Sequence, residues 1–316
     1  DKLVEDDDNT YYVDGNGVMV TNTWVKVVNE EQDEDDDPAE YHYYYMQGNG
    51  KAYKASNNTS TNTKFKTIDG KRYAFDDEGV MLYGWVDDQA NRLSDDSGWS
   101  DVNTDSPVYY LGSWEDGAMK TGWQKITVYD DQEDEDMDHW FYFQSNGKRF
   151  QKSSTTTDEY RTKTVNGKKY AFDDEGKMLF GWVDENSAER LDNTDGDAFK
   201  EGDYYFGGED DGAMTTGWLQ LDITYDEATN DDYKYTAAAF NDDEDQTRWF
   251  YFKSNGKKVK AENGDTQKSK TINGKKYEFD QYGAMTAEWS LDVDNIIYDR
   301  DSIRRKSCNH KCRSCS

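Results

Sequence analysis

The chain is poor in the residues on which disulfide scaffolds, metal centres and most acid–base enzymes depend. Its 316 residues include three cysteines, three histidines and two prolines. The cysteines, Cys308, Cys312 and Cys315, all lie at the very end, so the rest of the chain cannot hold a disulfide framework. No G-x-S-x-G or H-E-x-x-H motif occurs. The sequence therefore predicts a protein that is not an enzyme.

Long apolar runs and positive charge are also missing. No apolar stretch approaches the roughly 18 residues of a membrane span, so we expect no membrane insertion. The chain has 67 acidic and 37 basic residues, a net charge of −30. That balance excludes ordinary nucleic-acid binding, which needs a basic surface. It also disfavours adhesion to anionic polymers through the overall field, so any polymer must be held by local contacts.

Aromatic residues, at 15%, are far more frequent than in a disordered acidic chain, and they recur in a repeat. One variety is T-V-N-G-K-K-Y-A-F-D-D-E-G-K-M-L-F-G-W-V at Thr164–Val183, with copies at Thr67–Val86 and Thr271–Trp289. A second variety occupies Pro107–Trp123, Asp203–Trp218 and Thr10–Trp24. A third occupies His139–Phe150, Arg248–Val259 and His42–Tyr53. The three varieties follow one another in the same order three times.

Each copy is typical of a β-hairpin. Asn166-Gly167 favours a type I′ turn, which needs positive φ at both residues. In the strand that follows, Tyr170 and Phe172 alternate with Lys169 and Ala171, which indicates one packed face.

The second half of each copy is expected to contain another turn and a segment that runs back along the first. Gly176 stands where a left-handed conformation is needed. Residues 178–180 then return the chain, and Gly181-Trp182 closes the unit.

These patterns predict an all-β chain, a β-hairpin repeat solenoid of about nine hairpins in three triplets with acidic loop insertions. The boundaries we expect are 1–86, 87–183 and 184–289 for the triplets and 290–316 for a basic, cysteine-containing tail. Residues 1–10 are expected to be an acidic lead-in, with the first hairpin at Tyr11–Trp24. Residues 87–106, 130–138 and 184–203 are expected to be polar or acidic loops, and Thr236–Phe240 a helical turn.

The motifs N-G-K-K-Y-A-F-D and G-A-M-K-T-G-W, with their relatives across residues 10–289, resemble the cell-wall-binding repeats of Gram-positive surface proteins. That superfamily includes choline-binding modules, glucan-binding domains and the C-terminal repeats of clostridial toxins. The resemblance implies a secreted or cell-surface protein without catalytic activity. It also implies that glycans or choline-bearing polymers bind in shallow aromatic sites between hairpins.

Carried onto this sequence, the resemblance implies three aromatic pairs as ligand sites: Trp24 with Tyr43, Trp123 with Trp140, and Trp218 with Trp249. Such rings attract a quaternary ammonium by cation–π interaction. In the following hairpin, however, the slot equivalent to Trp140 holds Lys169, with Arg72 and Lys276 in the other copies. A cation there would repel choline and donate hydrogen bonds to sugar hydroxyls, which favours a glycan. The alternative is that these rings, like Tyr170 and Phe172, are simply core.

Other polar groups give weaker signals. The acidic run at 130–138 has oxygens without the glycine-centred geometry of an EF-hand, so no cofactor is expected, although calcium stays open. His42, His139 and Arg248 share one slot, which indicates a polar strand edge. The tail supplies zinc-type ligands at Cys308, His310, Cys312 and Cys315, but in one short run. An unstructured tail, a disulfide and a zinc site are the alternatives there.

Together these observations predict a multivalent module that binds a bacterial cell-wall polymer or glycan. A structural stalk or filament subunit, which would self-assemble, is the alternative from a different class. The targeting region of a larger wall hydrolase or toxin is a third possibility. Because the chain opens on D-K-L-V-E-D-D-D without a signal peptide, we expect a processed protein or an excised fragment.

Overall fold

The computed structural model describes residues 1–33, 37–55, 65–93, 98–100, 106–130, 133–151, 161–185, 190–225, 244–265, 267–286, 296–298 and 305–307. The chain divides into two compact units. Unit 1 comprises Asp1–Thr156 with Asp174–Met178, and unit 2 comprises Thr157–Asp173 with Leu179–Ser316.

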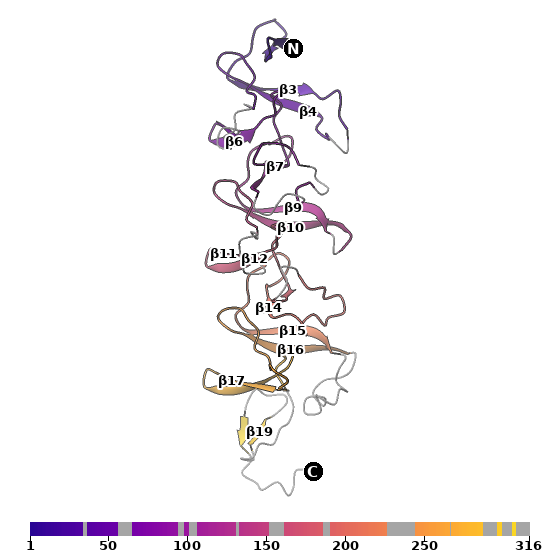
Figure 1. Cartoon of the computed structure of the whole chain (residues 1–316), viewed down its shortest axis with the longest axis vertical. Coiled ribbons are helices and arrows are strands. Elements are labelled where there is room, and N and C mark those ends of the chain that lie inside the picture. The colour runs from indigo at the N-terminus through magenta and orange to yellow at the C-terminus, as the bar shows by residue number, and fades with distance from the viewer. Residues whose placement is uncertain are drawn as a thin grey trace. The chain divides into compact units, whose positions relative to one another are not determined.

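The described residues form twenty strands in ten antiparallel two-stranded pairs, and within each unit the pairs follow one another along the chain (Figure 1). Unit 1 contains β1 (Lys2–Asp6) with β2 (Asn9–Val13), β3 (Thr23–Val28) with β4 (Tyr41–Met46), β5 (Phe65–Ile68) with β6 (Lys71–Ala74), β7 (Trp85–Asp87) with β8 (Val108–Tyr110), and β9 (Gly122–Asp130) with β10 (Glu135–Phe143). Unit 2 contains β11 (Arg161–Val165) with β12 (Lys168–Phe172), β13 (Trp182–Val183) with β14 (Tyr204–Tyr205), β15 (Gly217–Tyr225) with β16 (Glu244–Phe252), β17 (Gln267–Ile272) with β18 (Lys275–Asp280), and β19 (Ile296–Tyr298) with β20 (Arg305–Ser307).

The predicted all-β hairpin repeat is therefore confirmed, with nine pairs before residue 281 and a tenth inside the predicted tail. The described part of the chain has no helix long and apolar enough to cross a membrane. The division into three triplets stays a prediction. Thr236–Phe240 and the cysteines of the tail lie outside the described residues.

The turn residues act as expected. Asn166 and Gly167 have φ of 49° and 81°, and Asn273-Gly274 and Asp69-Gly70 repeat these values closely. Both central residues of each turn are thus left-handed, which is the type I′ geometry that matches the twist of the flanking strands. Gly176, at φ 85°, is also left-handed as predicted.

One position joins successive hairpins. At eight positions, the residue two places after a glycine that follows the second strand of a hairpin donates its backbone N–H to a carbonyl of a preceding hairpin, as Met81, two places after Gly79, does to Tyr43 at 2.8 Å. We call these the junction residues; the bonds are 2.7 or 2.8 Å long and run from Ala52 to Thr10, Met81 to Tyr43, Met119 to Arg72, Arg149 to Val108, Met178 to Trp140, Met214 to Lys169, Lys258 to Asp203 and Met285 to Trp249. The side chain of a junction residue lies over the turn glycine of the next hairpin, for instance Met81 over Gly117 and Met214 over Gly256. A Cβ at those glycines would overlap the methionine.

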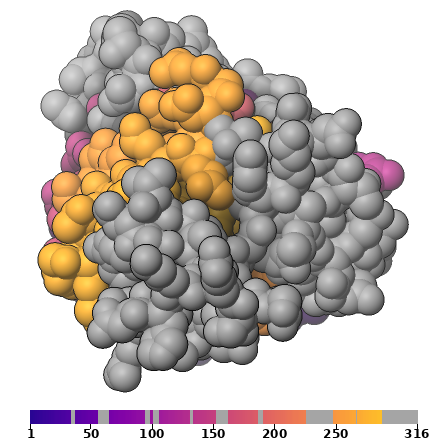
Figure 2. Space-filling model, turned by 90° about the horizontal axis from the view of Figure 1, so that it is seen from below, coloured from indigo at the N-terminus to yellow at the C-terminus, as the bar shows by residue number. Residues whose placement is uncertain are grey.

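The core is a series of small clusters. In unit 1, for example, Phe75 and Met81 form one cluster, and Trp85 and Phe141 belong to another. In unit 2, Trp182 and Phe250 belong to one cluster and Phe279 to another. The segment 244–286 of unit 2 is drawn in orange in Figure 2, where it lies at the surface in a view from below. Each of these four clusters joins side chains from neighbouring hairpins, as expected for a repeat array.

Four local expectations were wrong. Residues 2–6 are not a lead-in but form β1, which pairs with β2, so the first hairpin is Lys2–Val13 and not Tyr11–Trp24. The acidic run 130–138 is not simply a loop, because β9 and β10 extend through Asp130 and from Glu135. Ala171, expected on an open face, is fully buried beside Leu179 and Phe206. Trp182 does not close its repeat but opens the next hairpin, pairing with Tyr205.

Candidate ligand sites

Three tryptophans, Trp24, Trp123 and Trp218, begin the long hairpins β3–β4, β9–β10 and β15–β16. Each is directly opposite a tyrosine on the partner strand, and the ring centroids are 5.3 Å apart for Trp24–Tyr45 and 5.1 Å apart for Trp123–Tyr142 and Trp218–Tyr251. Edge-to-face contacts of this kind are a favoured aromatic geometry. They hold each indole across its own hairpin.

The predicted partner of each tryptophan stands two residues before the opposite tyrosine, on the same face of the hairpin. Trp140 is 6.3 Å from Trp123 with the rings at 89°, and Trp249 is 6.2 Å from Trp218 with the rings at 88°. Tyr43 packs with Trp24 against one cluster. The structure thus brings the second and third pairs into ring contact and places both members of the first pair against one cluster, and every member of the three pairs is partly exposed.

The following hairpin supplies two more rings to the first and third sites. Trp24 lies 4.8 Å from Tyr73 and 5.8 Å from Phe75, both at the end of or just after β6. Trp218 lies 4.7 Å from Tyr277 and 5.8 Å from Phe279, both in β18. The two units therefore build the same arrangement independently, to within 0.1 Å in these distances.

A methionine occupies the junction position at all three sites: Met81, Met178 and Met285. Its backbone N–H donates to the carbonyl of the second aromatic residue of the pair, which is Tyr43, Trp140 or Trp249. Met81 and Met285 also pack in the same clusters as Trp24 and Trp218. We call these three sites the methionine cages. Each combines a partly exposed indole and a second ring across the hairpin with a methionine at the junction position.

Basic residues occupy the position equivalent to Trp140 in the hairpins that follow the three sites. The backbone carbonyls of Arg72 and Lys169 accept hydrogen bonds from the N–H groups of Met119 and Met214. The carbonyl of Trp140 accepts the same kind of bond from Met178, so the three residues are structurally equivalent. This equivalence of the slots was expected from the sequence. The Arg72 guanidinium, however, donates to the Asn146 carbonyl at 2.9 Å and lies 5.0 Å from the Phe65 ring.

The corresponding lysines differ from Arg72. Lys169 is exposed, and Lys276 pairs with Glu278 at 3.4 Å. Contact of Lys169 and Lys276 with a ligand stays a prediction.

Two other tryptophans of the Gly-Trp step are enclosed. Trp85 and Trp182 are 1% and 3% exposed. Trp85 stacks 5.3 Å from Trp99, and Phe199 lies in the same cluster as Trp182. Sequence reasoning missed Trp99 and Phe199, because each lies within a stretch assigned as a polar loop; an isolated large aromatic in such a stretch is the signal that was available.

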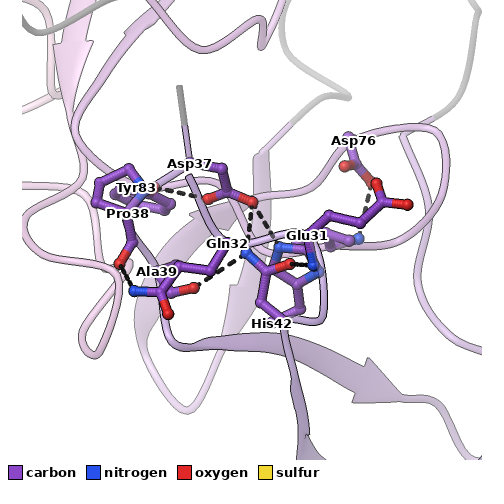
Figure 3. A network of polar contacts seen from close by, with 10 residues as sticks. Glu31, Gln32, Asp37, Pro38, Ala39, His42, Asp76 and Tyr83 are labelled. Carbon is purple, nitrogen blue, oxygen red and sulfur yellow. Dashed lines mark hydrogen bonds and ion pairs between the residues drawn. The ribbon is translucent and has the colours of Figure 1, made fainter. Parts of the chain in front are cut away.

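The position shared by His42, His139 and Arg248 was expected to be a polar strand edge, but its histidines make specific contacts. His42 Nε2 lies 2.7 Å from Asp37 Oδ2, and the Tyr83 hydroxyl donates to the other oxygen of Asp37 at 2.9 Å (Figure 3). These hydrogen bonds hold the pKa of Asp37 below its usual value, although burial acts in the opposite direction. His139, in the second copy, is buried against Asp130. Both histidines therefore bind carboxylates of their own hairpins.

Among the residues that the structure describes, no three histidine, cysteine, aspartate or glutamate side chains gather as metal ligands. The four potential ligands of the tail fall outside those ranges.

A family model for a putative cell wall binding repeat matches residues 1–19, 134–148 and 245–258. The first match contains the hairpin β1–β2, the second contains all of β10 and the third most of β16, each of these two with the turn that follows. These three segments are similar to a cell wall binding repeat. Their aromatic strands and Asn-Gly turns, at 140–147 and 249–256, are the elements that place Trp140 and Trp249 in the methionine cages.

Three solved structures that are similar to this chain come from Streptococcus pneumoniae. Choline binding protein F, determined in the presence of a peptidoglycan analogue, is 18% identical, with a TM-score of 0.41 over 95% of this chain and 97% of that one. The choline-binding domain of CbpL is 20% identical, with a TM-score of 0.35 over 82% and 86%. The modular autolysin LytC, in complex with a synthetic peptidoglycan ligand, is 17% identical, with a TM-score of 0.38 over 87% of this chain and 41% of its own length. No curated protein sequence matches significantly.

Proposed function

We propose that this chain is a multivalent, non-catalytic module that binds a bacterial cell-wall polymer or surface glycan at its methionine cages, in a secreted or cell-surface protein. The observation that carries the proposal is the repeated cage itself. Trp24 and Trp218, in separate units, have the same rings at nearly the same distances and remain partly exposed. A purely structural cluster would gain stability by enclosing the indole, as happens at Trp85.

The chemistry of the cage suits the flat face of a sugar ring or an organic cation. Indole and phenol rings offer an apolar face for stacking, and the same face attracts a cation. The first cage also has three tyrosines, Tyr43, Tyr45 and Tyr73, whose hydroxyls can exchange hydrogen bonds with sugar hydroxyls. With a net charge of −30, a polyanionic backbone would be repelled, so the contacts must be local.

Several weak cages on one chain give avidity for a polymer through effective concentration. We therefore expect weak binding of short fragments and much tighter binding of a polymer that reaches more than one cage. This distinction separates a wall-binding module from a receptor for one small molecule.

The test is a fluorescence titration with choline, glucan oligosaccharides and peptidoglycan fragments. Saturable quenching is expected for at least one of these ligands, and Trp218→Ala should lower the amplitude and weaken binding. Tyr129→Ala is the matched control, because Tyr129 is an exposed aromatic at the tip of β9, outside the cages. Its binding should equal that of the unsubstituted chain.

The outcomes divide the candidates. Quenching by choline alone identifies the organic cation, and quenching by sugars alone identifies the glycan. The absence of any response, together with concentration-dependent polymers in light scattering, would overturn the proposal in favour of a filament subunit.

A further inference from the structure

The junction position holds methionine in the methionine cages but a cation at the enclosed tryptophans. Arg149 and Lys258 are the junction residues whose backbone N–H groups bond to the hairpins of Trp85 and Trp182, and they are 4% and 1% exposed. Their backbone bonds, to Val108 and Asp203, match those of the methionines. The Arg149 and Lys258 side chains therefore start from the same backbone position as the methionine side chains, but they carry a positive charge.

Arg149 lies within an aromatic cage of unit 1. Its guanidinium carbon is 5.6 Å from the Trp85 ring centroid and 5.5 Å from that of Trp99. Phe141 completes the enclosure, at 5.1 Å from Trp85 and 5.6 Å from Trp99. Nε donates to Gln151 Oε1 at 2.8 Å, and a terminal nitrogen donates to the Trp99 carbonyl at 3.1 Å. The cation is thus held by ring faces and by the backbone of the loop that delivers Trp99.

Lys258 repeats the arrangement in unit 2. Its Nζ is 4.9 Å from the Trp182 ring and 5.9 Å from the Phe250 ring. The ammonium donates to the carbonyl of Phe199, which is itself fully buried and 5.9 Å from Phe250. In both units, therefore, the cation bonds to the carbonyl of the aromatic residue that the loop inserts.

The third copy of this junction position holds Ala52. Its backbone N–H bonds to Thr10, in β2, and β1 and β2 are joined by Asp7 and Asp8 alone. No long loop delivers an aromatic there, and no cation is present. The junction cation and the inserted loop aromatic thus occur together at two copies and are both missing at the third.

We propose that Arg149 and Lys258 are built-in occupants of aromatic cages, so that the cages of Trp85 and Trp182 take no external ligand while the methionine cages remain open. An ammonium or guanidinium group over an indole face makes the same cation–π contact as an external organic cation. Where a junction residue bonds to a hairpin that begins with a tryptophan, it is then the specificity-determining position: methionine leaves a cage available, and arginine or lysine fills it. This assignment rests on the proposed function for the open cages only.

The first experiment is chemical rescue of the filled cages. Arg149→Ala should lower the melting temperature by about 5–10 °C, and methylguanidinium at tens of millimolar should restore at least half of that loss. Lys258→Ala, at pH 6, should respond in the same way to n-butylammonium. Sodium chloride at equal ionic strength and neutral N-methylurea or butanol should not restore stability. Lys257→Ala is the matched control, because Lys257 is the adjacent lysine and pairs with Glu185 outside the cage.

Rescue of both alanine variants by cations and not by neutral analogues supports the proposal. Equal rescue by the neutral analogues, or no rescue by either, overturns it, since the cage would then show no preference for a cation. If an alanine variant does not fold alone, recovery of folding in the presence of the cation is read in the same way.

The second experiment maps the open cages in the unsubstituted chain. Indole N–H signals of the tryptophans, assigned with Trp→Phe variants, are followed during titration with choline and with a glucan oligosaccharide. Trp24, Trp123 and Trp218 should shift, and Trp85 and Trp182 should not. A saturable shift of Trp85 or Trp182 overturns the proposal. If no indole shifts, the proposed function fails, and the rescue experiment still decides the filled cages.

Discussion

Asp130 Oδ2 lies 2.6 Å from His139 Nε2, and both side chains are almost completely enclosed, at 4% and 6% exposure. One carboxylate of an acidic run is thus turned inward and paired. A buried carboxylate without a partner is costly, because its lost hydration is not replaced. The histidine therefore makes it possible for β9 to extend through an acidic residue.

Replacement of His139 by alanine should lower the free energy of unfolding by about 3–5 kcal/mol, because it removes the ion-pair partner of a buried carboxylate. His42→Ala is the control from the equivalent slot. Its pair with Asp37 is more open, at 26% and 34% exposure, so we expect a loss of about 1 kcal/mol or less. Urea denaturation at pH 7 measures both. Equal losses would show that burial of Asp130 does not set the difference.

The sequence was sufficient for the features that depend on local backbone chemistry. Asn166-Gly167 and its two equivalents predicted the turns of β11–β12, β17–β18 and β5–β6, because few residue pairs adopt positive φ at both positions. The pairing of Trp123 with Trp140 was implied by the resemblance to cell-wall-binding repeats, and β9 and β10 place the two residues on one face.

Features that depend on contacts distant in sequence were not predictable in this way. Trp182 pairs with Tyr205 across a long insertion, and nothing local to Gly181-Trp182 distinguishes the end of one repeat from the start of the next hairpin. Short strands of this kind are determined by packing more than by propensity. The burial of Ala171 similarly comes from Phe206, which belongs to a later hairpin.

The loop aromatics should contribute to the core despite their polar surroundings. Trp99→Ala should lower the free energy of unfolding by about 3–5 kcal/mol, because it leaves a cavity against Trp85 and Phe141. Trp114→Ala is the control, since Trp114 is partly exposed and its nearest ring partners, Tyr41 and Tyr43, are 6.3 and 6.4 Å away. Thermal or urea denaturation compares them. A smaller loss for Trp99→Ala than for Trp114→Ala would contradict the enclosed position of Trp99.

Turn glycines should fall into two classes. Gly167, at φ 81°, has no atom within 4 Å of an added Cβ, so Gly167→Ala should cost only the left-handed conformation, about 1–2 kcal/mol. Gly147, at φ 88°, has the side chain of Met119 against it, so Gly147→Ala should cost about 1–3 kcal/mol more.

A double-mutant cycle isolates the junction contact. In a Met119→Ala background the excess cost of Gly147→Ala should disappear, because the overlapping sulfur is gone. The cost of Gly167→Ala should be unchanged in that background. Additive effects of Met119→Ala and Gly147→Ala would mean that the junction side chain does not constrain the turn.

The lysine of the filled cage should make stability depend on pH. Burial lowers the pKa of Lys258 from 10.5 to about 7, with the nearby Lys260 acting in the same direction. Above pH 7 the folded chain has therefore lost a proton that the unfolded chain retains, and unfolding must take one up. The free energy of unfolding should accordingly rise between pH 7 and 9, by at most about 1.4 kcal/mol per pH unit from this group.

Lys258→Arg isolates that contribution. Arginine stays protonated in both states, and Arg149 shows that a guanidinium fits the equivalent place over the rings. Urea midpoints of the two proteins, measured from pH 7 to 9, should diverge steadily, with the unsubstituted chain gaining stability relative to the variant. Asp280, whose pKa burial raises to about 6, titrates below this window and should not contribute to the difference. Parallel pH profiles would mean that Lys258 keeps its proton in the folded chain, and that the ring faces and the Phe199 carbonyl offset its lost hydration.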